Sequence, residues 1–140
     1  MVDASVVAHW LLTDQPLRLP MTLGADADLA APHLIDAEVA HAIRRHLLTG
    51  LISVDRAEIA LQDLMVLPVE RYPHTRLLRR AFALRDNATI YDALYLALAE
   101  ALGTTLLTRD KALTTVPGVD VPVEVVTNGT WAMSQGRRSR

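Results

Sequence analysis

Apolar residues run almost without interruption through residues 87–102 and stop at Gly103. From Ile90 onward, a helix in this stretch would have no polar face to turn toward water, so the pattern predicts a helix buried in the core. An aspartate, Asp92, nevertheless lies in the first turn of that helix. A carboxylate at the start of a buried helix needs a hydrogen-bond donor or a cation as its partner.

Three other stretches place apolar residues at helical spacing, and they cover residues 34–48, 53–67 and 73–85. The apolar stripe of the first consists of Ile35, Val39, Ala42, Ile43 and Leu47. The stripe of the second consists of Ala57, Ile59, Ala60, Leu61, Leu64 and Met65. Because the first two helices are joined by a short connection, we expect them to form a hairpin that projects from the rest of the fold.

Short apolar or β-branched runs between these helices predict strands. The runs lie at residues 1–7, 30–34, 66–69, 104–108 and 121–127. The first passes from a short strand directly into a helix, and the second contains Pro32, which places it at an edge or at a strand end. Strands that alternate with helices predict an α/β fold, with a central, mostly parallel sheet flanked by helices on both faces. We expect residues 1–131 to form a single domain and residues 132–140 to form a mobile, arginine-rich tail.

The composition excludes several classes of protein. Half of the 140 residues are hydrophobic, which excludes disorder for most of the chain, and the absence of cysteine excludes disulfides, thiolate metal sites and a cysteine nucleophile. No apolar run reaches the roughly 18 residues of a membrane span, and no basic segment precedes the apolar N-terminus as in a signal peptide. These features predict a cytoplasmic protein without a membrane partner. The net charge of −2 gives no electrostatic sign of nucleic-acid binding.

Four acidic positions stand at the ends of predicted elements. Asp3 and Asp110 follow strands, whereas Asp92 and either Asp36 or Glu38 open helices. In a parallel α/β sheet, the C-terminal ends of strands and the N-termini of the following helices meet at one edge. The four acids are therefore expected to converge, although each of them could instead cap a helix or favour its dipole. Helical periodicity alone leaves the choice between Asp36 and Glu38 open.

Converging carboxylates need a cation among them unless some of them are protonated. Two of them about 4 Å apart repel by roughly 4 kcal/mol at an effective dielectric constant of 20, which is large beside a typical total stability of about 5–15 kcal/mol. A cage built only from oxygen atoms suits Mg²⁺ or Mn²⁺. One or two such ions are what hydrolysis of a phosphodiester requires.

Other sequence signatures of function are absent or incomplete. Glu38 and His41 form half of a di-iron motif, but no second such pair exists. The chain has no glycine-rich phosphate loop and no nucleophile elbow around a serine. The acidic positions therefore carry the functional prediction.

Four segments of the chain, in this order, resemble the PIN-domain ribonucleases, and in particular the VapC toxins of bacterial toxin–antitoxin pairs. The matching segments are residues 2–7, 38–45, 87–100 and 106–110, with Leu113. The leading strand is shorter than is usual in that family. The resemblance favours Glu38 over Asp36 as the acid of the first long helix.

The resemblance implies a metal-dependent endoribonuclease with Mg²⁺, or Mn²⁺, as its cofactor. On this basis the catalytic and metal-binding acids are Asp3, Glu38, Asp92 and Asp110, and the polar residues that line or shape the site are Ser5, Asn87 and Thr108. The resemblance also implies an RNA substrate such as transfer RNA, a cognate antitoxin protein and a homodimer. The alternative hypothesis is a non-catalytic PIN-like module that binds RNA or an antitoxin without cutting.

The basic residues qualify the low net charge. Every basic residue except Lys111 is an arginine, the side chain that pairs best with phosphate. Arginines between residues 76 and 85, together with Arg44, Arg45, Arg109 and Lys111, are candidates for contact with an RNA backbone. A solvated surface is the alternative for the pair Arg44 and Arg45.

Overall fold

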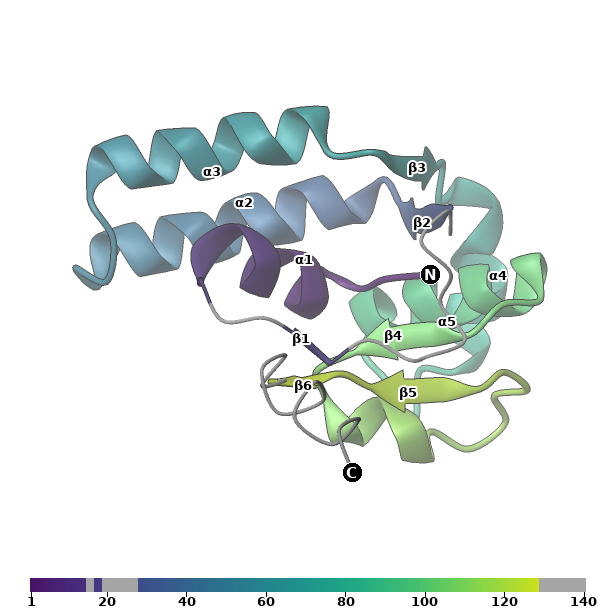
Figure 1. The fold of residues 1–140 in the computed structure, drawn as a ribbon. Helices are drawn as coiled ribbons and strands as arrows, with labels where there is room; N and C mark the ends of the chain where they lie inside the picture. The colour runs from purple at the N-terminus through teal and green to yellow at the C-terminus, as the bar shows by residue number, and fades with distance from the viewer. Residues whose placement is uncertain (15–16, 19–27, 129–140) are drawn as a thin grey trace, which may run out of the picture.

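The computed structural model describes residues 1–14, 17–18 and 28–128 (Figure 1). The helices in these ranges are α1 Ala4–Leu12, α2 Leu34–Leu48, α3 Val54–Val66, α4 Leu78–Ala83 and α5 Ile90–Leu102, with 3₁₀ helices η1 Thr75–Leu77 and η2 Lys111–Thr115. The strands are β1 Leu17–Arg18, β2 Leu29–Pro32, β3 Val69–Tyr72, β4 Leu106–Thr108, β5 Val123–Val125 and β6 Thr127–Asn128. The tail predicted at residues 132–140 lies outside the described residues.

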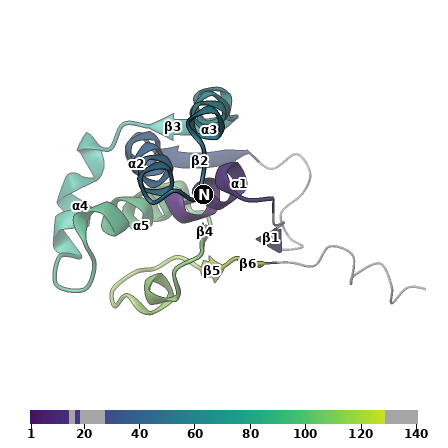
Figure 2. The ribbon, with the colours of Figure 1, turned by 90° about the vertical axis from the view of Figure 1, so that its left-hand side faces the viewer.

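Residues 1–3 join two pairs of strands into one parallel sheet. β2 pairs in parallel with β3, and β4 pairs in parallel with β5. Val2 N donates to Ala30 O at 3.1 Å on one side, and Val2 forms a parallel bridge with Leu107 on the other. The strands therefore follow the order β3, β2, residues 1–3, β4, β5, with α4 and α5 on one side and α1 on the other (Figure 2). This arrangement confirms the predicted α/β fold.

The central segment is short but firmly held. Leu107 N donates to Met1 O at 2.9 Å, and Asp3 N donates to Leu107 O at 3.1 Å. Val2 is completely buried between its neighbours. The backbone turns into α1 directly after these bonds, so Asp3 lies at the C-terminal end of the central segment, as predicted.

α5 is the buried helix that the apolar run predicts. The seven consecutive residues from 93 to 99 are all buried, because α5 contacts β2, β4 and α4 around most of its circumference. Thr89 caps its start by accepting a hydrogen bond from Asp92 N at 3.1 Å. Gly103 ends it in the left-handed conformation, with φ of 61°, which a residue with a side chain adopts at a cost.

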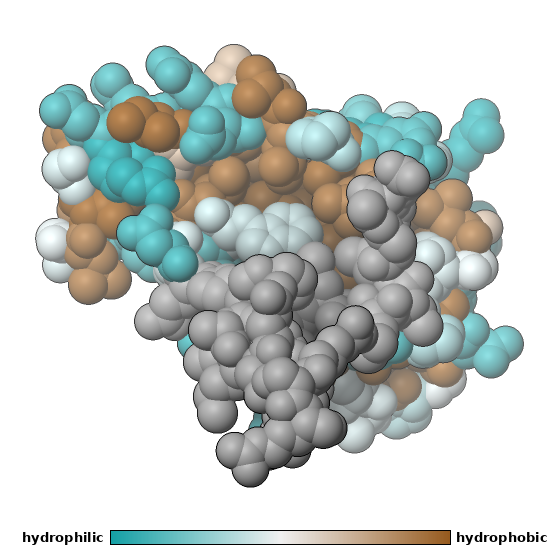
Figure 3. All heavy atoms as spheres, viewed as in Figure 1, coloured by the Kyte–Doolittle hydropathy of each residue, from teal (hydrophilic) through white to brown (hydrophobic). Residues whose placement is uncertain are grey.

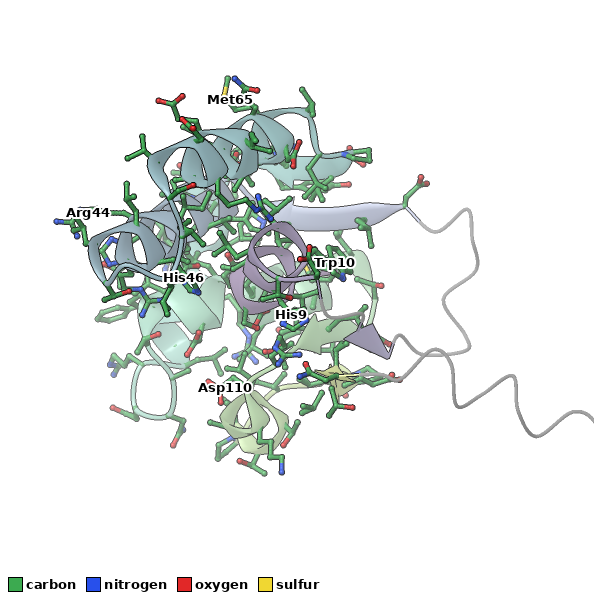
Figure 4. All side chains as sticks on the ribbon, turned by 60° about the vertical axis from the view of Figure 1, so that its left-hand side comes forward. His9, Trp10, Arg44, His46, Met65 and Asp110 are labelled. Carbon is green, nitrogen blue, oxygen red and sulfur yellow. The ribbon has the colours of Figure 1, made fainter. Side chains whose placement is uncertain are left out.

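α2 and α3 form the predicted hairpin, capped at the start of α3 by Ser53, whose hydroxyl accepts from Arg56 N. The prediction of the buried stripe on α3 was partly wrong. Ile59, Leu61 and Met65 are 52%, 43% and 73% exposed, because the part of the helix that faces α2 is narrower than the apolar pattern suggests. The exposed apolar side chains give the upper edge of the molecule its brown patches (Figure 3), and Met65 lies on the outer side of α3 (Figure 4).

Other element boundaries differ from the prediction as well. The apolar residues 66–69 were expected to form a strand, but α3 continues to Val66 and the strand runs from Val69 to Tyr72. The helix expected over residues 73–85 is divided into η1 and the short α4. Among the described residues, no helix is long and apolar enough to cross a membrane.

Candidate functional site

Asp3 is a buried acid with several hydrogen-bond donors around it. Its Oδ1 accepts from Ser5 Oγ at 2.5 Å and from Val6 N at 3.2 Å, so the side chain also caps α1. Its Oδ2 accepts a hydrogen bond from Thr108 Oγ1. Burial raises the pKa of the Asp3 carboxyl, and the donors oppose that rise.

Ser5 and Thr108 connect Asp3 to the end of β4. Ser5 Oγ accepts from Arg109 N at 2.9 Å, and Thr108 Oγ1 accepts from Asp110 N at 3.0 Å. Each hydroxyl therefore donates to Asp3 and accepts from the backbone just beyond β4. This network fixes the position of Asp110 relative to Asp3.

Glu38 lies in the second turn of α2, opposite Tyr95 of α5. Burial raises the pKa of the Glu38 carboxyl, the nearby Tyr95 hydroxyl lowers it, and the charges of Asp92 and Asp3 raise it further. Burial and the negative charge of Glu38 in turn raise the pKa of Tyr95. Glu38 Oε1 and the Tyr95 hydroxyl are nevertheless both buried without a partner in hydrogen-bond geometry among the described residues. The interior therefore contains two polar side chains whose hydrogen-bonding capacity is not fully used.

Asp92 is half-buried in the first turn of α5, where the helix dipole favours its ionised form. Burial raises its pKa, the charges of Asp110 and Asp3 raise it further, and Thr89 lowers it. Asp110 is the most exposed of the four acids, and it lies where β4 passes into η2 (Figure 4). Its Oδ1 accepts from Ala112 N at 2.9 Å and so caps η2.

These interactions bring the four predicted acids into one electrostatic cluster. Asp3 acts on Glu38 and on Asp92, and Asp92 acts on Glu38 and is itself acted on by Asp110. In the side-chain conformations seen, however, no three acids, histidines or cysteines of the described ranges lie close enough to hold one metal ion. A cation shared by the cluster would therefore require at least one side chain to rotate.

The chemistry of the cluster fits a hard divalent cation. Its donors are all carboxylate oxygens, the ligands that Mg²⁺ and Mn²⁺ prefer. Glu38 Oε1 is a buried acceptor without a donor among the described residues, and three of the four carboxyl groups have raised pKa values. A bound cation would give Glu38 Oε1 a partner, and its positive charge would stabilise the ionised form of the three carboxyl groups.

Asp36 has a different role from Glu38. Its carboxylate accepts two hydrogen bonds from Arg71 Nε, at 2.8 and 3.0 Å. The same guanidinium donates to three backbone carbonyls near the end of α3, those of Leu64, Leu67 and Val69. Asp36 is thus part of a structural ion pair, and Glu38 faces the acid cluster.

Among the described residues, the Asn87 side chain forms no hydrogen bond with the other predicted site residues. Asn87 is exposed in the turn before α5, where its backbone N donates to Leu84 O at 3.0 Å. Its assignment to the site stays a prediction that rests on the resemblance.

Sequence reasoning missed Tyr95 and a groove beside Glu38. Tyr95 belongs to the apolar run, and its spacing of three residues from Asp92 was the only signal that it shares a side of the helix with that acid. The groove has a volume of about 610 Å³. It is lined by Ala4, Ser5, Ala8, Leu34, Ala37, Glu38, His41, Ala42, Arg45 and Tyr91.

Comparison with known proteins agrees with this architecture. The model of the PIN domain family matches residues 1–119. Ribonuclease VapC1 of Mycobacterium tuberculosis is 50% identical over 97 residues, which cover 69% of this chain and 73% of that protein. Ribonuclease VapC9 of the same organism is 38% identical over 125 residues, 89% of this chain and 96% of that protein.

A solved structure has the same fold. The crystal structure of PAE2754 from Pyrobaculum aerophilum superposes with a TM-score of 0.55 at 25% identity, and the match covers 86% of each chain. The chain belongs to the PIN domain family and, within it, to the VapC group.

Proposed function

We propose that this chain is a metal-dependent endoribonuclease that hydrolyses phosphodiester bonds in RNA, and that it is the toxin of a toxin–antitoxin pair. The observation that carries the proposal is the cluster of Asp3, Glu38, Asp92 and Asp110 at the C-terminal edge of a parallel sheet. The ribonuclease names of its relatives in the VapC group support the same activity.

The four acids are the proposed ligands of Mg²⁺, with Mn²⁺ as the alternative ion. When bound, such an ion supplies an activated water and stabilises the negative charge that develops on the phosphate. Ser5 and Thr108 hold Asp3 in place through the hydrogen bonds described above. The Tyr95 hydroxyl lies near Glu38 and lowers the pKa of its carboxyl, which favours the ionised form that a metal ion needs.

The proposed partners follow from the VapC resemblance. They are an RNA substrate, such as transfer RNA, a cognate antitoxin that blocks the acid cluster, and a second copy of this chain in a homodimer. We place this activity in the cytoplasm, where such a substrate is available.

The test is cleavage of total RNA by the purified chain with Mg²⁺ or Mn²⁺, and again with a chelator. We expect cleavage that depends on the metal. Asp92→Asn and Glu38→Gln should each reduce it by at least about 100-fold, the scale that accompanies loss of one group that stabilises developing charge.

Matched controls use exposed acids of α3. Asp63→Asn and Glu58→Gln make the same chemical changes far from the cluster and should cut like the unaltered chain. Equal cleavage by Asp92→Asn and by the unaltered chain would overturn the nuclease assignment. Metal-independent binding of RNA without any cleavage would favour the non-catalytic PIN-like module instead.

A further inference from the structure

The groove beside Glu38 extends from the acid cluster along one side of α2. Its α2 residues are Leu34, Ala37, Glu38, His41, Ala42 and Arg45, which recur at intervals of three and four and so share one helix face. From Glu38 to Arg45 the helix rises by about 10 Å, at 1.5 Å per residue. The groove therefore has an acidic end and a basic end separated by roughly the length of one or two nucleotides.

Small side chains line much of the groove between these ends. They are Ala4, Ser5 and Ala8 of α1 and Ala37 and Ala42 of α2. Because short side chains leave the backbone accessible, a flat or bulky group can lie close to the two helices. The small lining side chains therefore leave room for a planar group such as a nucleobase.

Tyr91 lies at the side of this groove, one residue before Asp92. Its side chain is 60% exposed, whereas residues 93–99 of the same helix are all buried. Among the described residues, Tyr91 makes no recorded hydrogen bond or ring contact. An exposed aromatic ring beside a cluster of acids is suited to stack on a nucleobase.

Arg45 supplies the positive charge at the other end. It is exposed, and it forms no ion pair with any described residue. Its neighbour Arg44 points away from the molecule on the outer side of α2 (Figure 4) and does not line the groove. Substitutions of Arg45 and Arg44 can therefore be compared directly, because one arginine lines the groove and the other lies on the outer surface of α2.

We infer that this groove binds a single-stranded segment of RNA next to the cleaved bond, with one unpaired base stacked on Tyr91 and a neighbouring phosphate bound by Arg45. The inference rests on the proposed function, because it places the cleaved phosphate at the acid cluster. A nucleotide in a duplex cannot present the face of its base to an aromatic ring, so the substrate class is RNA with unpaired nucleotides at the cut. The positive charge of Arg45 favours a ligand with a phosphate backbone over a peptide that carries few acidic residues.

The test measures binding rather than cleavage, so that it stays separate from the nuclease proposal. A ten-nucleotide unstructured RNA carries 2-aminopurine at each position in turn and is titrated, with Mg²⁺, against the full chain bearing Asp92→Asn. Fluorescence quenching at one or two adjacent positions is expected where the base stacks. Adding Tyr91→Leu should remove that quenching and weaken binding on the order of tenfold, whereas Tyr91→Phe should preserve both.

Matched controls are available for both contacts. Phe82 is also 60% exposed but lies on α4 and stacks on Arg85, so Phe82→Leu should leave binding and quenching unchanged. Arg45→Gln should weaken binding and reduce the dependence of log affinity on log salt by about one, the loss of one phosphate contact. Arg44→Gln should leave that slope unchanged.

The outcomes separate the two proposals. Quenching that persists in Tyr91→Leu, or an equal response to Phe82→Leu, overturns the groove assignment even if the chain cuts RNA. Loss of quenching in Tyr91→Leu supports the groove even if the unaltered chain proves unable to cut. Absence of RNA binding together with protection of Tyr91 by a protein partner would reassign the groove to protein recognition.

Discussion

Asp3 and Asp92 have the same side chain and opposite surroundings. Asp3 is 6% exposed and accepts hydrogen bonds from two hydroxyl groups and from the backbone of α1. Asp92 is half-buried, and both its burial and the charges of Asp110 and Asp3 raise its pKa. The hydrogen bonds of Asp3 therefore join β4 to α1 and offset part of the cost of its burial, whereas the repulsion on Asp92 stays a cost to the fold unless a cation is bound.

The contrast predicts opposite effects of one chemical change. Asp3→Asn replaces an acceptor with a donor that faces Ser5 and Thr108, and it should lower the free energy of unfolding by about 1–3 kcal/mol. Asp92→Asn removes a repelled charge and should leave that free energy unchanged or raise it. Urea denaturation of both variants in chelator measures the difference. Equal destabilisation by the two substitutions would contradict these roles.

At the scale of elements, Arg71 fastens α3 to the start of α2. Its guanidinium bonds three carbonyl oxygens near the end of α3 and the Asp36 carboxylate. Glu38 lies two residues after Asp36, so this attachment also sets the position of the acid cluster on the α2 side. The ion pair itself is partly exposed to water, with side chains 22% and 43% accessible, and so contributes less than the carbonyl bonds.

Arg71→Gln should therefore destabilise the chain by about 1–3 kcal/mol, mostly through the carbonyl groups that lose a charged donor. Asp36→Asn should cost less, because it leaves the carbonyl bonds intact. Hydrogen exchange should show faster opening of the end of α3 in Arg71→Gln. An effect of Asp36→Asn as large as that of Arg71→Gln would place the stabilisation in the ion pair instead.

The sequence predicts an element well where only one pattern can explain the residues. The apolar run of α5 is compatible only with a buried helix, and the start, the burial and the end of that helix were predicted. Residues 66–69 are apolar enough to end a helix or begin a strand, and the sequence does not contain the tertiary contacts that decide between them. The pattern indicated Asp3, Asp92 and Asp110 because each follows a strand or opens a helix.

Contacts across elements were less accessible to sequence reasoning. The approach of Tyr95 to Glu38 depends on how α5 lies relative to α2, which no local pattern encodes. The same holds for Arg45, whose neighbour Arg44 is chemically identical but faces away from the groove. The choice between Asp36 and Glu38 needed the family resemblance, and the ion pair with Arg71 now gives its structural reason.

At the scale of the whole molecule, the acid cluster makes stability depend on pH. Raised pKa values in the folded state mean that the folded chain binds protons more tightly than the unfolded chain. The stability contributed by these groups is full below the unfolded pKa of about 4 and is lost as pH rises through the folded pKa values. Glu100 acts in the opposite direction, since Arg80 lowers its pKa and the resulting stability is lost only at more acidic pH.

In chelator, the melting temperature should therefore rise when the pH falls from 7 to 5. Mg²⁺ should raise the melting temperature more at pH 7 than at pH 5, because protons and metal compete for the same carboxylates. Differential scanning calorimetry with and without Mg²⁺ measures both effects. The Asp92→Asn variant should show a weaker dependence on pH, and an unchanged slope in that variant would remove Asp92 from the cluster.

The central segment of the sheet, residues 1–3, pairs with β4, a strand that the ribosome synthesises much later. Val2 bridges Leu107, and Asp3 accepts a hydrogen bond from Thr108. Because synthesis proceeds from the N-terminus, residues 1–3 can pair with β2 long before β4 exists. Until β4 and the start of η2 have emerged, Asp3 has neither the hydrogen bond from Thr108 nor the neighbouring carboxylate of Asp110. A nascent chain carries no complete acid cluster, and any cleavage that depends on it begins only after that point in translation.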